Sequence, residues 1–276
     1  MRASMKSGPG PGGLQTAAGL PLASHGRIKS PMSEPLPTPP RRRLWIWLAV
    51  AVMVLGAVAA GYALYQAHQA QLGARLLAAM PDDVDKHSDL VRYAKAEARP
   101  LFARNCAGCH GLDLKGRGIG APDLTDSIWL YGSGVFHIER TITYGIRSGQ
   151  KKANDITEMP AFGQRGQLSD TEIRNIVQYL LQLNHRPYND QAAFLGKQAY
   201  ETKGQCFDCH AGDAKGIIDY GAPDLTANVW DFGGSPQDLY DSIYYGRHGI
   251  MPAWIGKLTP EQIRALAVYV DTASKR

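Results

Sequence analysis

The strongest constraint on this chain is an internal repeat, which links residues 97–184 to residues 196–271. Each copy contains Cys-x-x-Cys-His, then Gly-Ala-Pro-Asp-Leu-Thr, a tryptophan, and Met-Pro-Ala before an aromatic residue. The matched landmarks are Cys106–His110 with Cys206–His210, Gly120–Thr125 with Gly221–Thr226, Trp129 with Trp230, and Met159–Phe162 with Met251–Trp254. Self-similarity of this kind indicates a duplicated structural unit. The sequence therefore predicts two small domains in tandem, residues 93–185 and 190–276.

Each copy ends in a predicted amphipathic helix. Ser169 with Glu172, and Thr259 with Gln262, have the spacing of a capping box, and Pro260 suits the first turn. The apolar residues that follow at helical spacing are Ile173, Ile176, Val177, Leu180 and Leu181 in the first copy, and Ile263, Leu266, Ala267 and Val270 in the second. Shorter helical stretches precede the cysteine pairs, around 93–103 and 192–201. These patterns predict a mostly α fold.

The copies differ by one insertion. Met159 lies 14 positions after Gly145, whereas Met251 lies only five positions after Gly246. The extra residues, roughly 148–157, are polar and include Lys151 and Lys152. We expect them to form a surface loop.

An uncharged apolar segment precedes the repeats. Leu44 to Tyr65 contains 22 residues without a charge, and a helix of that length spans roughly 33 Å, enough for a bilayer core. A signal-peptide core is shorter, and a buried helix of this length would normally show a polar face. The sequence predicts a transmembrane helix over 44–65, preceded by a disordered tail (1–43) and followed by a linker (66–92).

The charge distribution gives the direction of this helix. Arg41, Arg42 and Arg43 directly precede it, and the positive-inside rule places them in the cytoplasm. The predicted location is a single pass of a bacterial inner membrane, with a cytoplasmic N-terminus and the repeats in the periplasm. Residues 1–66 carry seven Lys/Arg and one acid, whereas residues 67–276 carry 23 Lys/Arg and 24 acids. A nucleic-acid partner is therefore not expected.

The cysteine motifs predict two covalently bound haem c groups. The chain has four cysteines, and Cys106, Cys109, Cys206 and Cys209 all lie in Cys-x-x-Cys-His. The thiols would add to the haem vinyl groups, and His110 and His210 would ligate the iron. Zinc would need a fourth ligand at each motif. A thioredoxin-like pair would need a βαβ context, and a local disulfide would leave the histidines without a role.

The other axial ligand of each haem is expected to be a methionine. Met159 and Met251 lie 49 and 41 residues after His110 and His210 and occupy matched positions in the repeat. A single methionine is more often core filler, and His137 and His248 are alternative ligands. Further candidates are Pro122 and Pro223, whose carbonyls would accept a hydrogen bond from the proximal histidines, and Trp129, Trp230, Arg147 and Arg247, which could contact haem propionates.

With these motifs in place, residues 44–276 resemble the dihaem cytochrome c subunit (subunit III, the CcoP/FixP family) of cbb3-type cytochrome c oxidases. The resemblance rests on the anchor, the tandem repeat, and the phrases Trp129–Gly132, Gly196–Tyr200 and Met-Pro-Ala-Phe/Trp. It implies class I cytochrome c domains with His110–Met159 and His210–Met251 as axial pairs. It differs from many family members in having a low-complexity tail and a single span.

The resemblance also implies a function. Electrons from a soluble or membrane-bound donor cytochrome would pass to the catalytic subunit of a terminal oxidase that also contains a monohaem subunit. A free-standing membrane-anchored dihaem carrier would have the same motifs, so its partners must distinguish the two. A dihaem peroxidase would need an open axial position, which two matched Met-Pro motifs argue against. No nucleophile–base or carboxylate pair predicts a catalytic site in this chain.

Overall fold

The computed structural model of the chain describes residues 41–116, 120–154 and 158–275. Within these residues the secondary structure is helical, accompanied by isolated β-bridges. The chain divides at Gly56 into two compact units, Met1–Gly56 and Ala57–Arg276. The mostly α fold class is confirmed. Of the tail predicted to be disordered (1–43), residues 1–40 lie outside the described part, whereas residues 41–43 are helical and belong to the first turn of α1.

Helix α1 runs from Arg41 to Ala78 and extends beyond the predicted span at both ends. In the described part of the chain it is the one helix long and apolar enough to cross a membrane. The large apolar side chains between Leu44 and Tyr65 are exposed. Much of the segment expected to be a linker is helical, and α1 stops just before Pro81, because the residue before a proline disfavours helical backbone.

The second unit contains the repeats. Its remaining helices are η1 (Pro81–Lys86), α2 (Ser88–Asn105), α3 (Ala107–His110), α4 (Val135–Tyr144), α5 (Asp170–Leu183), α6 (Asp190–Glu201), α7 (Phe207–His210), η2 (Ile218–Tyr220), α8 (Pro236–Tyr245) and α9 (Pro260–Ser274). Both predicted capping boxes are present, at Ser169 and Thr259. All the apolar side chains predicted to face the core in α5 and α9 are buried.

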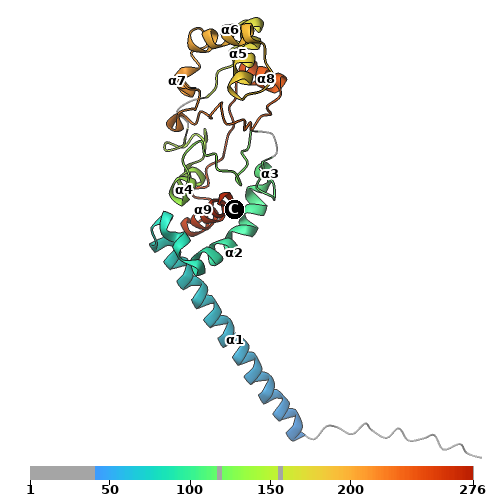
Figure 1. Cartoon of the computed structure of the whole chain (residues 1–276). Helices are drawn as coiled ribbons and strands as arrows, with labels where there is room; N and C mark the ends of the chain where they lie inside the picture. The colour runs from blue at the N-terminus through green and yellow to red at the C-terminus, as the bar shows by residue number, and fades with distance from the viewer. Residues whose placement is uncertain (1–40, 117–119, 155–157, 276) are drawn as a thin grey trace, which may run out of the picture. The chain divides into compact units, whose positions relative to one another are not determined.

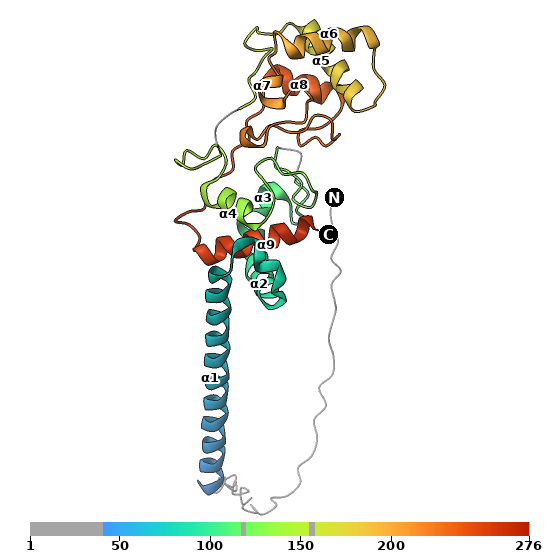
Figure 2. The same cartoon turned by 60° about the vertical axis from the view of Figure 1, so that its left-hand side comes forward.

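The two hydrophobic cores do not follow the order of the repeats. Helix α5, which closes the first repeat, packs against α6 and α8 of the second repeat. Helix α9, which closes the second repeat, packs against α2 and α4 of the first (Figures 1 and 2). The first core is therefore built from the end of α1, α2, α4 and α9, and the second from α5, α6 and α8. Residues 93–185 and 190–276 delimit the sequence repeats, but each repeat completes its core with the last helix of the other.

The connection between α5 and α6 explains this exchange. Only residues 184–189 join the two helices, and helices joined by so short a loop pack side by side as an antiparallel hairpin. Gly196 permits their close approach, because a Cβ there would overlap the carbonyl oxygen of Asn175. Once α5 pairs with α6, helix α2 is available only to α9, which buries Ile263 and Leu266 in the first core.

Candidate haem-binding sites

Both Cys-x-x-Cys-His motifs form one tight helical turn. In the first, α2 ends at Asn105 and the amide of His110 donates to the carbonyl of Cys106 over 3.0 Å. In the second, the amide of His210 donates to the carbonyl of Cys206 over 2.9 Å. The backbone thus gives the two thiols and the imidazole of each motif the same local arrangement, as the repeat predicts.

The two imidazoles are suited to ligate a metal. Burial lowers the pKa of both His110 and His210, and the backbone carbonyls of Pro122 and Pro223 partly oppose this effect. The rings are therefore neutral at pH 7, which is the form that binds iron. Nδ1 of His210 lies 3.1 Å from the carbonyl oxygen of Pro223, which confirms the predicted contact at the second site. Nδ1 of His110 is buried, and no hydrogen-bond partner is found for it in the described part.

The thiols are free in this structure and have the chemistry expected before haem attachment. Burial raises the pKa of Cys106 to about 11 and that of Cys206 to about 12, and it also raises the pKa of Cys209. The cysteines of redox-catalytic pairs have a lowered pKa instead, so the raised pKa of these thiols argues against a thioredoxin-like pair. Each motif supplies two thiols and one imidazole, one ligand too few for a closed zinc site, so the donor set fits covalent haem better than a structural zinc ion.

The exchange of helices also exchanges the methionines. Met159 is partly buried and packs against the second core, as do Cys206 and Trp230. Met251 packs against the first core, as do Cys106 and Trp129. Each methionine precedes a closing helix and enters the core to which that helix belongs. The axial pairs His110–Met159 and His210–Met251 that the resemblance implied stay predictions.

The backbone of each methionine is held by a two-bond bridge that the sequence did not reveal. Met251 and Ile146 exchange N–H···O bonds of 3.0 Å in both directions, and Met159 and Arg247 do the same at 3.1 Å. Ile146 and Arg247 are matched residues, each directly after the glycine that follows α4 or α8. The bridges depend on the exchange, so a pattern within one repeat could not indicate them.

The other predicted residues take different positions. His137 and His248 are exposed, whereas Trp129 and Trp230 are partly buried against their cores. The guanidinium of Arg247 lies 4.5 Å from the Phe232 ring centre, and its Nε donates to Ser242 Oγ over 2.9 Å. Arg147 Nε donates to the carbonyl of Gly249 over 2.6 Å.

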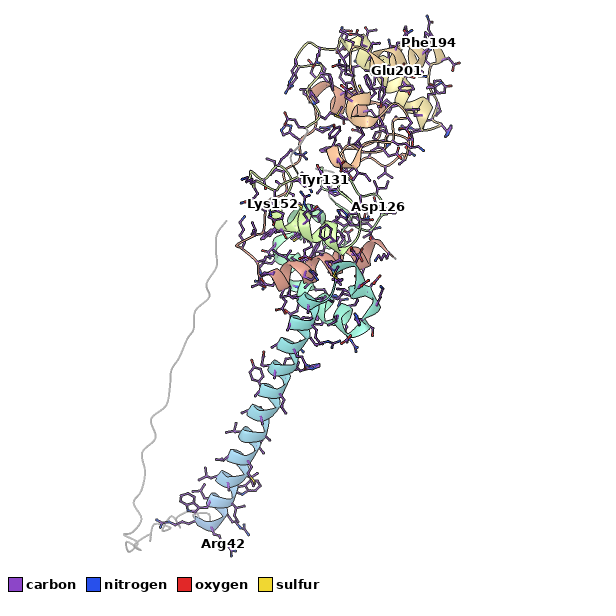
Figure 3. All side chains as sticks on the ribbon, turned by 90° about the vertical axis from the view of Figure 1, so that its left-hand side faces the viewer. Arg42, Asp126, Tyr131, Lys152, Phe194 and Glu201 are labelled. Carbon is purple, nitrogen blue, oxygen red and sulfur yellow. The ribbon has the colours of Figure 1, made fainter. Side chains whose placement is uncertain are left out.

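The two halves of the second unit meet through matched loops. The ring of Tyr131, labelled in Figure 3, lies against Gly221, and the ring of Phe232 lies against Gly120. The insertion is exposed at Lys151 and Lys152, as predicted, and its residues 155–157 lie outside the described part. Asn154 fixes the described end of this loop, because its amide donates to Gly145 over 3.1 Å.

Comparison with known proteins agrees with these motifs. The family model described as cytochrome c oxidase, cbb3-type, subunit III matches residues 94–180 and 191–270. The chain belongs to this family. It is 38% identical to the cbb3-type cytochrome c oxidase subunit FixP of Bradyrhizobium sp. (strain ORS 278), over 72% of this chain and 68% of that protein. It is 39% identical to FixP of Bradyrhizobium diazoefficiens, over 74% and 68% of the two chains. It is 37% identical to subunit CcoP of Cereibacter sphaeroides, over 66% and 62%.

The two matched segments of the subunit III family model coincide with the two sequence repeats. Each therefore includes one Cys-x-x-Cys-His motif and one Met-Pro-Ala motif. A member of this family with such a duplicated motif is a haem c protein, and α1 is its candidate membrane anchor.

Proposed function

We propose that this subunit binds two haem c groups and passes electrons from a donor cytochrome to the catalytic subunit of a cbb3-type oxidase, alongside a monohaem subunit. The observation that carries the proposal is the pair of Cys-x-x-Cys-His turns, each in a core that also receives one bridged methionine. The first haem would be held by Cys106, Cys109, His110 and Met251, and the second by Cys206, Cys209, His210 and Met159.

The protein supplies fixed ligands at both sites. Haem c, when bound, provides one-electron redox chemistry. Burial keeps His110 and His210 neutral, and the Pro223 carbonyl orients the His210 ring. The bridges from Ile146 and Arg247 fix the methionine backbones, so the sulfur donors need little rearrangement when the charge of a site changes. Methionine–histidine ligation favours a raised potential.

Variants that retain one haem test the exchanged ligand pairs. With Cys206→Ala and Cys209→Ala, only the first haem would be attached. In that background Met251→Leu is expected to lower the haem potential and abolish methionine ligation in the optical spectrum, whereas Met159→Leu leaves both unchanged. The opposite result would assign each methionine to the haem of its own repeat.

Copurification tests the role in the oxidase. The full chain, solubilised from its native membrane, is expected to bring down a catalytic haem–copper subunit and a monohaem cytochrome subunit. Mass spectrometry of the same preparation is expected to show two added haems. Recovery of the dihaem chain alone would point instead to a free-standing carrier.

The proposed topology places the N-terminus in the cytoplasm and both haem cores in the periplasm of the inner membrane. Arg41, Arg42 and Arg43 before the apolar span support it. Alkaline phosphatase fused after residue 80 is expected to be active, because that enzyme folds only outside the cytoplasm. An inactive fusion would reverse the orientation.

A further inference from the structure

The two repeats carry an arginine at one matched position but give it different partners. In the first core this arginine lies at the end of the membrane helix. Arg264 of α9 and Arg174 of α5 are each five residues after their N-cap residue. Their partners, Glu139 of α4 and Tyr240 of α8, are each six residues before the glycine that follows the helix. The same helix pair thus carries an arginine in both cores, but the arginine has a different partner in each.

In the second core the arginine is a surface residue. The side chain of Arg174 is 63% exposed and lies 3.5 Å from Asp170. Its guanidinium lies 4.7 Å from the centre of the Tyr240 ring. Exposed pairs of this kind contribute little to stability.

In the first core the matched arginine is buried. The side chain of Arg264 is 10% exposed and pairs with Glu139, which is 24% exposed. Its Nη1 also donates to the carbonyls of Leu76 and Ala79, over 3.2 and 3.0 Å. One guanidinium therefore connects α9, α4 and the end of α1.

The end of α1 has backbone carbonyls that require hydrogen-bond donors, and this guanidinium supplies them. The last carbonyls of a helix lack partners within the helix, and Pro81 has no N–H to offer them. A positive charge at a helix C-terminus is also favourable. Leu72 and Leu76 bury their side chains in the first core, so the carbonyls beside them are shielded from water and require a donor from the protein.

We propose that Arg264 is a positioning residue that fixes the first haem core to the end of membrane helix α1. Glu139 neutralises its charge, and the planar fork of donors reaches the carboxylate and the carbonyls together. The inference rests on the proposed function insofar as the core carries a haem. Electron tunnelling rates fall steeply with distance, so a fixed position of this core on its anchor would keep the route to a membrane partner constant.

The test measures how well α1 is fixed to the core in the full, haem-loaded chain. Spin labels on ketone-bearing amino acids at the exposed positions Gln71 and Ala103 report the distance between α1 and α2 by pulsed electron resonance, without using the cysteines. Arg264→Gln is expected to make the distance distribution about twofold broader, because it leaves a partly buried carboxylate and two carbonyls without a donor. The matched variant Arg174→Gln is expected to leave the distribution unchanged.

Arg264→Lys keeps the charge but cannot reach all three acceptors, so it is expected to give an intermediate width. If Arg264→Gln fails to fold, Arg264→Lys becomes the test of the proposal. A broadened distance distribution in Arg264→Lys supports the proposal, and an unchanged distribution overturns it. An unchanged width in a folded Arg264→Gln chain also overturns it. Mass spectrometry for two haems tests the proposed function separately, since haem can be attached whether or not α1 is fixed.

Discussion

At the scale of single residues, the two Cys-x-x-Cys-His turns end differently. Gly111 follows the first histidine with φ 74° and ψ 155°, and Ala211 follows the second with φ 62° and ψ 166°. This backbone region is populated almost only by glycine, and another residue there costs on the order of 1–3 kcal/mol. The second site therefore carries strain that the first avoids.

This difference predicts opposite effects of two substitutions. Ala211→Gly is expected to raise the free energy of unfolding by about 1 kcal/mol, because it relieves the strained conformation. Gly111→Ala is expected to lower it by at least as much, since the new Cβ would also lie close to the Asp113 carboxylate. Denaturant unfolding of the haem-loaded chain measures both. A destabilising Ala211→Gly variant would contradict the strain argument.

Glu172 makes the second core sensitive to acid. Hydrogen bonds from Lys203, and then from Ser169, lower the pKa of Glu172 to about 2. Because the pKa in the folded state lies below the usual value of 4.5, this interaction stabilises the protein above about pH 4.5 and is lost as pH falls towards 2. The pair is close to solvent, so we expect an effect of about 0.5–1 kcal/mol.

Two substitutions test this contribution. Glu172→Gln is expected to flatten the pH dependence of stability between pH 4.5 and 2, as measured by denaturant unfolding. The matched residue in α9 is Gln262, which is already neutral. Gln262→Glu is therefore the second substitution, because it introduces a carboxylate at the matched position. An unchanged pH profile in Glu172→Gln would show that other groups cause the acid sensitivity.

At the scale of elements, the exchange of closing helices predicts which core a substitution weakens. Ile173 and Ile263 are matched buried residues of α5 and α9, with exposures of 0% and 4%. Replacing either by alanine is expected to cost about 2–5 kcal/mol. Ile263→Ala, although in the second repeat, is expected to destabilise the first haem core, and Ile173→Ala the second. The order in which the two haems lose methionine ligation on heating measures this, and the reverse order would contradict the exchange.

Local elements were predictable, whereas their partners were not. The capping boxes at Ser169 and Thr259 and the apolar faces behind them follow from residues within one helix. The partner of each helix depends on chain connectivity, and the signal was the short connection 184–189. Because the cysteines and proximal histidines lie within one turn, their local geometry was predictable. The core that each methionine enters depends on the exchange of closing helices, so a pattern within one repeat could not predict it.

In the membrane helix, too, the local feature was predictable from the sequence and the long-range packing was not. Hydropathy located its apolar part, residues 44–65, because that property is local to the sequence. The helix continues to Ala78 because its last turns bury Leu72 and Leu76 in the first core. Packing between distant parts of the chain therefore explains why α1 extends beyond its apolar part, and hydropathy carries no information on this extension.

At the scale of the whole molecule, the exchange gives the two cores different folding requirements. The second core uses α5 to α8, a continuous stretch of chain. The first core joins α2 to α9, whose residues are separated by about 170 positions, and closing a long loop adds an entropic cost that grows slowly with length. Contacts of high sequence separation also form slowly. The first cysteine motif thus precedes the second in the chain, but its core is expected to be completed last.

Removal of α9 tests this dependence directly. A chain that ends at Leu258 retains both Cys-x-x-Cys-His motifs and both methionines, but α2 and α4 lose the helix that covers them. The first haem is expected to lose methionine ligation and the second to keep it, as judged by optical and electron resonance spectra of the purified chain. Self-contained repeats would give the opposite result, because α9 would then belong to the second haem core. The position of the spectral change therefore distinguishes exchanged helices from independent domains without any change to a ligand.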